Sequence, residues 1–424
     1  MNSEKQSTNL QMTLREVNRV GEGQKNVPKL RFKGYEDAWE QRKLGEVSQI
    51  VGGGTPSTGI PEYWDGDIDW YSPVEIGEEI FVSCSQRKIT QLGLEKSSAK
   101  ILPVGTVLFT SRAGIGNTAI LEKEGCTNQG FQSIVPKDNE LDSYFIFSCS
   151  HLLKKYGETK GAGSTFVEIS GKQMSLMPLN IPEIKEQKSV GNFFRKLDSI
   201  ITLHQRKYDA LKLMKKTLLS RMFPKNGEDV PEIRFKGFTD AWEQRKLGSE
   251  FKKVNERNDG TFGKGHWISV AKMYFQDPEK VQSNNIDTRT YVMRLGDIAF
   301  EGHPNNEFQF GRFVANDIGD GVVSELFPVY RHNNQYYNNY WKYAIQQERI
   351  MAPIFAKSIT SSGNSSNKLD PKHFLRQKIR IATLEEQKNI GDFLAEIDNL
   401  ITLHQRKLDE LKNMKKTLLQ QMFV

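Results

Sequence analysis

Residues 181–223 read IPEIKEQKSVGNFFRKLDSIITLHQRKYDALKLMKKTLLSRMF, and residues 381–423 read IATLEEQKNIGDFLAEIDNLITLHQRKLDELKNMKKTLLQQMF. The two stretches lie 200 residues apart and are identical at more than half of their positions. In both, apolar or large residues recur at alternating spacings of four and three, a pattern that predicts a long amphipathic helix. The chain therefore carries an internal repeat, and the shared part of the repeat is a helix.

The apolar seam of each predicted helix is formed by residues at heptad spacing. In the first copy these are Leu197, Ile201, His204, Tyr208, Leu211, Leu218 and Met222, and in the second Ile397, Ile401, His404, Leu408, Leu411, Leu418 and Met422. Lys215 and Lys415 interrupt the two seams. The histidines either set the register as polar seam residues or lie half-exposed at a helix surface.

A partner is needed for each of these helices. About 40 helical residues span roughly 60 Å, and a lone helix of that length leaves its apolar stripe uncovered. The natural partner of each copy is the other copy. Because each helix follows its own domain, we expect the two helices to pair as an antiparallel coiled coil with an internal pseudo-two-fold repeat.

A second block repeats at the opening of each predicted domain, at an offset of 203 residues. Residues 28–46 read PKLRFKGYEDAWEQRKLGE, and residues 231–249 read PEIRFKGFTDAWEQRKLGS. Residues 47–180 and 250–380, between the matched blocks, show no convincing alignment. The chain therefore alternates variable domains with near-identical helices.

The expected fold class is α+β, with two mixed α/β domains and two long helices. Short strand-like runs such as residues 105–110 and 296–301 alternate with glycine-rich turns, and residues 143–156 predict a helix. The expected layout is a flexible leader at 1–27, a variable domain at 28–180, a helix at 181–223, a linker at 224–230, a variable domain at 231–380 and a helix at 381–424.

Composition excludes several classes of protein. Hydrophobic residues make up 37% and charged residues 26% of the 424 residues, which allows real cores. No apolar run approaches a membrane span, and the N-terminus lacks the apolar region of a secretory signal, so we expect a cytoplasmic protein. Cys84, Cys126 and Cys149 fit neither a disulfide framework nor a zinc site. The net charge of +7 permits a polyanionic partner without requiring one.

Polar side chains gather in the loops of both variable domains. Arginine pairs with guanine edges, asparagine and glutamine with adenine edges, and serine and lysine suit phosphates. Ordinary solvated loops are the alternative interpretation of each single residue. The candidates for DNA contact are Arg112, Asn117, Asn128, Gln129, Gln132, Lys160, Ser164 and Thr165 in the first domain, and Asn305, Asn306, Gln309, Arg312, Ser362, Asn364 and Lys368 in the second.

Catalytic motifs are missing from the sequence. The run Gly161–Thr165 lacks the lysine of a phosphate-binding loop, and the glycines at Gly52–Gly54 lead into Thr55-Pro56 rather than a helix. We find no nucleophile elbow, metal-nuclease pattern or adenine-methyltransferase motif. We expect a binding protein without catalytic residues, metal or cofactor of its own.

The layout resembles the specificity subunits of type I restriction–modification systems. The phrases that carry the resemblance are DAWEQRKLG at 37–45 and 240–248, GTVLFTSRAGIG at 105–116, NQGFQSIVP at 128–136, and IPEIKEQK at 181–188 with its echo IATLEEQK at 381–388. The resemblance covers residues 28–423. The second domain departs from it, because residues 301–306 (EGHPNN) stand in the place of the RAGIG loop.

The resemblance implies two target-recognition domains that each read half of a split DNA sequence, with the helices setting the gap. It also implies two modification subunits, which would carry S-adenosylmethionine, and restriction subunits, which would use ATP and magnesium. A scaffold that joins two protein-binding domains through a coiled coil is the alternative from another class. An enzyme whose site cannot be recognised is the third.

Overall fold

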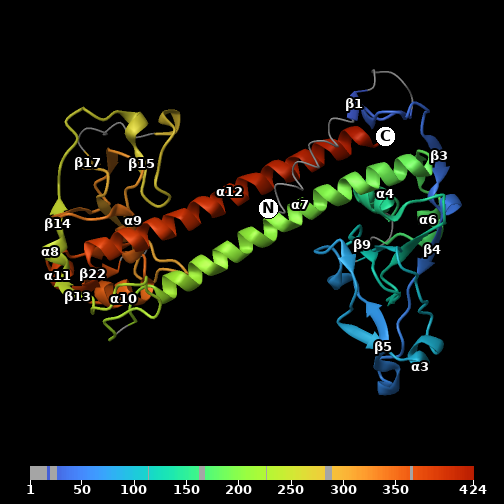
Figure 1. Ribbon diagram of the computed structural model, residues 1–424, viewed down its shortest axis with the longest axis horizontal. Coiled ribbons are helices and arrows are strands. Elements are labelled where there is room, and N and C mark those ends of the chain that lie inside the picture. The colour runs from blue at the N-terminus through green and yellow to red at the C-terminus, as the bar shows by residue number, and fades with distance from the viewer. Residues whose placement is uncertain are drawn as a thin grey trace. The chain divides into compact units, whose positions relative to one another are not determined.

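The computed structural model describes residues 17–19, 26–112, 114–161, 168–225, 227–281, 289–362 and 366–424. It divides into two compact units, each containing one variable domain and parts of both long helices (Figure 1). Unit 1 comprises residues up to 205 together with 406–424, and unit 2 comprises residues 206–405.

The two repeated stretches form long helices, α7 (Ile184–Arg221) and α12 (Leu384–Met422). Pro182 precedes α7, and Pro224, which cannot continue a helix, follows it. Two acidic residues, Glu385 and Glu386, lie in the first turn of α12. Their negative charges there interact favourably with the positive end of the helix dipole. The expectation of two long helices among mixed α/β domains is confirmed.

The domain of unit 1 is built on a mixed five-stranded sheet in the order β4-β11-β8-β9-β6 and a three-stranded sheet in the order β10-β5-β7. Its strands are β1 (Val17–Arg19), β2 (Leu30–Phe32), β3 (Glu40–Lys43), β4 (Ser48–Gly52), β5 (Trp64–Tyr71), β6 (Phe81–Val82), β7 (Arg87–Ile89), β8 (Val107–Phe109), β9 (Thr118–Leu121), β10 (Cys126–Thr127), β11 (Gln132–Pro136) and β12 (Pro178–Ile181). Its helices are α2 (Leu44–Val47), η1 (Pro61–Tyr63), η2 (Pro73–Glu75), α3 (Gln91–Glu95), α4 (Ser143–Ser148), α5 (Ser150–Gly161) and α6 (Gly171–Ser175).

The domain of unit 2 has a four-stranded sheet in the order β14-β21-β18-β19. Its strands are β13 (Glu243–Lys246), β14 (Phe251–Val254), β15 (Ile268–Ser269), β16 (Tyr274–Phe275), β17 (Thr290–Met293), β18 (Ile298–Glu301), β19 (Arg312–Ala315), β20 (Gly321–Ser324), β21 (Val329–His332), β22 (Ile359–Ser362), β23 (Asn367–Leu369) and β24 (Lys378–Ile381). Its helices are α8 (Leu247–Glu250), η3 (Lys264–His266), η4 (Pro278–Lys280), α9 (Asn338–Ala344), α10 (Glu348–Ala356) and α11 (Pro371–Arg376).

The five-stranded sheet of unit 1 and the four-stranded sheet of unit 2 are each covered on both faces, which explains why their strands β8 and β18 are mostly apolar. In β8, Val107 and Phe109 belong to the main core of unit 1, whereas Leu108 points into a smaller core on the opposite face. In β18, Phe300 and Ala299 divide in the same way between two cores of unit 2. Such continuous apolar runs are typical of strands buried on both faces.

The expected single helix over residues 143–156 is instead two helices, α4 and α5. Cys149 separates them, with φ −80° and ψ 7°, and its N–H donates to the carbonyls of both Phe145 and Ile146. This shared hydrogen bond tightens the last turn of α4 and ends it. The apolar periodicity continues across the break, so it could not reveal two helices.

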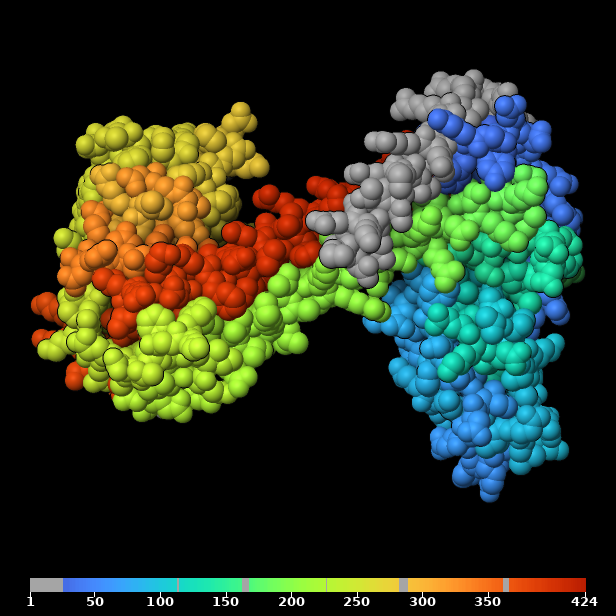
Figure 2. Space-filling model, in the orientation of Figure 1, coloured from blue at the N-terminus to red at the C-terminus, as the bar shows by residue number. Residues whose placement is uncertain are grey.

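The main core of each unit lies where its domain meets the long helices. In unit 1 it includes Phe193 and Leu197 of α7 together with Leu418 of α12. In unit 2 it includes Met222, just after α7, and Leu394 of α12. In the space-filling view, the first part of α12 is flanked on both sides by other segments of unit 2 (Figure 2).

None of the helices in the described part of the chain has the length and apolarity that a membrane crossing requires.

Candidate functional site

The helix segments in unit 1 run antiparallel. Lys415 Nζ of α12 lies 2.6 Å from Asp198 Oδ1 of α7, and Lys412 Nζ donates to Gln205 Oε1 at 3.3 Å. Residue numbers therefore rise along α7 as they fall along α12. The buried Leu197 belongs to the same core as residues from the end of α12.

The helix segments in unit 2 cross in the same sense. Lys215 Nζ of α7 lies 2.6 Å from Asp398 Oδ1 of α12. One or two turns further along α7, Leu218 and Met222 share a core with Leu394. The expected antiparallel pairing is thus present in each unit.

Every seam residue identified from the sequence is at least partly buried. Leu197, Met222, Ile397, Leu408, Leu411, Leu418 and Met422 are buried, while Ile201, His204, Tyr208, Leu211, Leu218, Ile401 and His404 are half-buried. Burial and the charge of Lys207 lower the pKa of His404, so this half-buried ring is neutral near pH 7. A role for the histidines in setting the register stays a prediction.

The start of each long helix is held by a buried ion pair to the repeated segment that opens its domain. Arg31 binds Glu186 through two hydrogen bonds of 2.7 and 2.8 Å, and Arg234 binds Glu386 through two of 2.6 and 2.8 Å. The Glu186 and Glu386 side chains are 1% and 0% exposed. The fork of each guanidinium therefore fixes where a helix begins relative to its domain.

The end of each long helix carries a phenylalanine that packs on a tryptophan of the repeated AWEQRKLG segment. Phe423 lies 6.1 Å from Trp39 between ring centroids, and Phe223 lies 5.9 Å from Trp242. Phe423 follows the helix of the second copy but packs in the domain of the first. Phe223 follows the helix of the first copy but packs in the domain of the second, so the two copies exchange their helix ends.

Several candidate residues for DNA contact meet at one loop cluster in unit 1. The segment after β8 and the segment after β10 are joined, because the N–H of Ser111 donates to the carbonyl of Gly130 at 2.8 Å. A Cβ at Gly130 would lie 3.0 Å from Asn128 Oδ1 and 3.7 Å from Arg112 Nε, so these two side chains lie close together. Gln129 is exposed beside them and accepts a hydrogen bond from Thr55 Oγ.

The other candidates of the first domain lie around this cluster. Asn117 donates through Nδ2 to the carbonyl of Ile76 at 3.1 Å, so this part of its side chain is already hydrogen-bonded within the domain. Gln132 begins β11 and faces Gly52 and Gly171, and Lys160 is exposed near the end of α5. Ser164 and Thr165 lie outside the described residues.

The second domain places its own polar loop, residues 302–311, between β18 and β19. The N–H of Asn367 donates to the carbonyl of Gly302 at 2.8 Å, just as the N–H of Ile169 donates to that of Ser111 at 3.1 Å in unit 1. The EGHPNN loop therefore occupies the position that the RAGIG loop has in unit 1. Asn305, Asn306, Gln309 and, on β23, Lys368 are exposed here. Asn364 and the side chain of Ser362 lie outside what the structure describes.

Arg312 differs from the other candidates because its side chain is engaged inside the domain. Its Nη2 donates to the carbonyl of Ala271 at 2.5 Å, and its Nε lies 3.6 Å from Glu301 Oε2. The guanidinium also lies 5.3 Å from the Phe308 ring centroid. These contacts position the base of the loop, whereas the Arg112 side chain makes no hydrogen bond or ion pair among the residues that the structure describes.

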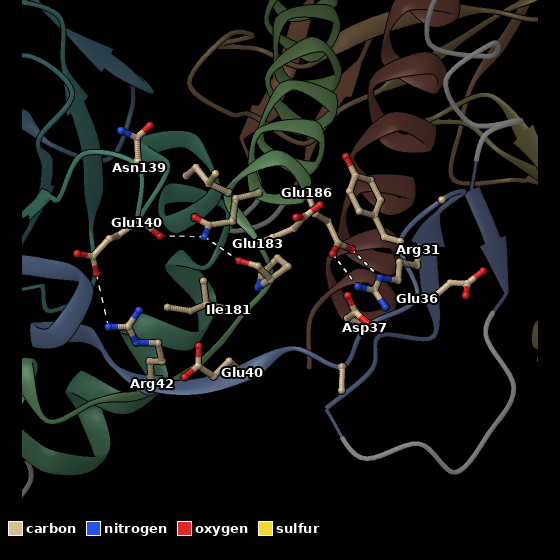
Figure 3. Close-up of a pocket in the computed structure, with 16 residues that line it drawn as sticks. Arg31, Glu36, Asp37, Glu40, Arg42, Asn139, Glu140, Ile181, Glu183 and Glu186 are labelled. Carbon is tan, nitrogen blue, oxygen red and sulfur yellow. Dashed lines mark hydrogen bonds and ion pairs between the residues drawn. The ribbon is translucent and has the colours of Figure 1, made fainter.

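A polar cavity of about 380 Å³ lies beside the Arg31–Glu186 ion pair in unit 1 (Figure 3). Six carboxylates line it against two guanidinium groups: Glu36, Asp37, Glu40, Glu140, Glu183 and Glu186 against Arg31 and Arg42. Arg42 pairs with Glu140 at 3.5 Å. An excess of negative charge repels phosphates, so this face of unit 1 is poorly suited to DNA.

Among the described residues, no group of three or more histidine, cysteine or acidic side chains could hold a metal ion.

Residues that organise both units were not recognised from the sequence. These are Glu186, Glu386, Asp198, Asp398, Trp39, Trp242, Phe223 and Phe423. A signal was present, because each recurs at the matching place in both copies of the repeat. Recurrence shows that a residue matters, but only the structure shows its partner on another segment.

Comparison with known proteins identifies the family. The model of the type I restriction modification DNA specificity domain matches residues 36–213 and again residues 248–413. The chain belongs to this family. The resemblance drawn from the sequence is thereby confirmed, and each match covers one variable domain with most of the helix that follows it.

Two curated relatives come from Methanocaldococcus jannaschii. The type I restriction enzyme MjaIX specificity subunit is 33% identical over 230 residues, which cover 52% of this chain and 53% of that protein. The alignment thus spans about half of that relative. The MjaVIII specificity subunit is 19% identical over 417 residues, covering 90% of this chain and 91% of that protein.

A solved structure supports the fold. The crystal structure of a type I restriction–modification system S subunit from M. genitalium is similar with a TM-score of 0.50 at 14% sequence identity. The match covers 94% of this chain and 99% of that one.

Proposed function

We propose that this chain is the DNA-reading specificity subunit of a type I restriction–modification complex. Each variable domain reads one half of a bipartite DNA target, and the paired helices set the unread gap between the halves. The domains run over residues 28–180 and 231–380, with a linker at 224–230 and a leader at 1–27. The chain does no catalysis itself, and its place is the cytoplasm, where cellular DNA is available.

The observation that carries the proposal is the contrast between the two parts of the repeat. The helix contacts recur residue for residue, as with Lys415–Asp198 in unit 1 and Lys215–Asp398 in unit 2. The loops that present Arg112 and Asn306 have unrelated sequences at equivalent positions. Helices that repeat within the chain suit identical partners, and loops that differ between the two copies suit two different half-sites.

Two modification subunits dock on the helices and domain edges. The helix segments in unit 2 expose large apolar side chains, with Leu213 at 66% and Leu403 at 60% exposure. Apolar side chains exposed on a surface helix are typical of protein contacts. In this assembly S-adenosylmethionine belongs to the modification subunits, and ATP with magnesium belongs to the restriction subunits.

Domain exchange tests the two-reader model. We expect that replacing residues 47–180 by the variable domain of another specificity subunit changes one half of the methylated sequence and leaves the other half and the gap unchanged. The matched control replaces residues 250–380 and should change the opposite half. A change of both halves in either chimera would contradict independent reading.

The alternative is a scaffold that joins two protein-binding domains and does not bind nucleic acid. Phosphate contacts make DNA affinity fall steeply with salt. We therefore expect the complex with modification subunits to bind duplex DNA less tightly as salt rises. Binding that is absent, or that does not respond to salt, would favour the scaffold.

A further inference from the structure

One lysine interrupts the apolar seam of each long helix, and each of these lysines meets a carboxylate on the other helix. Lys415 Nζ lies 2.6 Å from Asp198 Oδ1 in unit 1, and Lys215 Nζ lies 2.6 Å from Asp398 Oδ1 in unit 2. The four residues are related by the 200-residue repeat. The second pair is therefore the first pair with the two helices exchanged.

A tyrosine from the variable domain completes each pair. The Tyr144 hydroxyl of α4 donates to Asp198 Oδ2 at 2.9 Å, and the Tyr343 hydroxyl of α9 donates to Asp398 Oδ2 at 2.7 Å. We call these sets the Tyr–Asp–Lys triads, one per unit, completed by Lys415 and Lys215. Each triad ties three segments together: a variable domain, the helix of its own copy and the helix of the other copy.

The triads are sufficiently buried for their pairing to matter. The Asp198 and Lys415 side chains are 6% and 27% exposed, and those of Asp398 and Lys215 are 29% and 26% exposed. A charge in an apolar seam is tolerated when it has a partner and is costly without one. Burial, with the neighbouring aspartate, raises the pKa of Tyr144 above its usual range, so its hydroxyl remains a donor.

The rest of the seam gives little information on register. Within the seam itself, a slide of one heptad brings apolar residues opposite apolar residues again, so the packing of the seam alone tolerates it. Outside the seam, the slide would also withdraw Phe423 from Trp39 and Phe223 from Trp242. Such a slide moves one helix by about 10 Å, given a rise of about 1.5 Å per residue. Along DNA that distance is about three base pairs. In the slid register, the ion pair between the lysine and the aspartate of each triad would be broken, and both charges would lie unpaired in the seam.

We propose that the two Tyr–Asp–Lys triads determine the length of the unread DNA between the half-sites. The lysine–aspartate pairs select one register of the two helices, and the tyrosines attach each recognition domain to that register. This inference rests on the proposed function. It makes these residues positioning residues for target specificity, since their side chains contact one another where the helices and the domain meet.

The test removes both charges of each pair together, so that no unpaired charge is left in the seam. Asp198 and Asp398 are replaced by Asn, and Lys215 and Lys415 by Met, in the full chain expressed with its cognate modification subunit. The host lacks adenine methylation, and methylated sites are found by single-molecule sequencing. We expect unchanged half-sites but more than one gap length, with at least one site in ten away from the wild-type gap.

Two matched controls accompany this variant. Replacing the exposed neighbours Lys216 and Lys416 by Met makes the same chemical change one position along each helix, and a single gap length is expected. Exchanging the charges within each pair, so that aspartate becomes lysine and lysine becomes aspartate, keeps the attraction and should also give a single gap. Thermal unfolding of each complex separates loss of stability from loss of register.

The inference is overturned if the neutralised variant methylates sites with the wild-type gap alone, even at a reduced level. In that case the triads stabilise the fold without setting the gap. If that variant does not assemble, the Tyr144→Phe and Tyr343→Phe double variant, which lacks only two hydroxyls, is used instead. The gap lengths of its methylated sites then decide the question in the same way. A wild-type chain that gives no bipartite motif would overturn the proposed function, and the role of the triads with it.

Discussion

Glu386 shows how much of the molecule depends on single buried side chains. Its carboxylate is fully buried and binds the Arg234 guanidinium and Trp242 Nε1, the latter at 3.1 Å. We expect Glu386→Gln to lower the free energy of unfolding by about 3–5 kcal/mol, because Arg234 would keep its charge without a counter-charge. Urea denaturation measures the loss. The neighbouring exposed Glu385→Gln is the control, and an equal loss in both variants would contradict this role.

Two arginines of the candidate site should respond differently to truncation. Arg112→Ala should leave stability unchanged and weaken specific DNA binding by about 1–3 kcal/mol, the range for one base-contacting arginine. Arg312→Ala should instead lower stability, because it removes contacts to Ala271 and Glu301. DNA affinity of the complex and thermal unfolding are measured for both. Similar effects of the two variants on affinity would contradict the distinction.

At the residue scale, the sequence predicted kinds of residue better than their roles. Seam residues such as Leu197 and Leu418 were recognised because helical periodicity alone decides which face is buried. Lys215 was recognised only as an interruption, since its partner Asp398 is 183 positions away in sequence. Periodicity reports burial on one element, whereas an ion pair depends on how two elements meet.

The aromatic side chain of Phe423 helps to hold the end of α12, together with Leu418, Met422 and Lys415. The ring centroid of Phe423 lies 5.5 Å from that of Phe145 and 5.8 Å from that of Phe194, and the ring also contacts Trp39. We expect Phe423→Ala to cost about 3–5 kcal/mol, as for other buried aromatic truncations. Hydrogen exchange should quicken in α12 beyond residue 406, while residues 384–405, which belong to unit 2, should stay protected. Uniform exchange along α12 would contradict separate anchoring, and Val424→Ala, which is exposed, is the control.

At the element scale, the two long helices could be predicted almost completely, because apolar residues at helical spacing over more than 30 residues are compatible only with a helix. Short elements were harder. The break between α4 and α5 at Cys149 leaves the apolar pattern unchanged and could not be seen. The strands next to Arg112 and Asn305 were predicted from their apolar runs. The loops that follow these strands are joined to later segments of the chain by backbone hydrogen bonds, which no sequence pattern predicts.

At the scale of the whole molecule, the repeat explains how one chain offers equivalent surfaces twice. Each unit contains one variable domain, the start of the helix that follows it and the end of the other helix. The same contacts recur in both units, from the Arg31–Glu186 and Arg234–Glu386 ion pairs to the two triads. A repeated surface fits two identical partners, whereas the differing loops fit an asymmetric target.

The methylation pattern directed by the unmodified chain tests the central claim most directly. The chain is expressed with its cognate modification subunit in a host that lacks adenine methylation, and the genome is sequenced molecule by molecule. The account predicts one new bipartite motif, with two different half-sites separated by an unread gap of fixed length. A stable complex that adds no methylation, or that methylates one uninterrupted sequence, would contradict it.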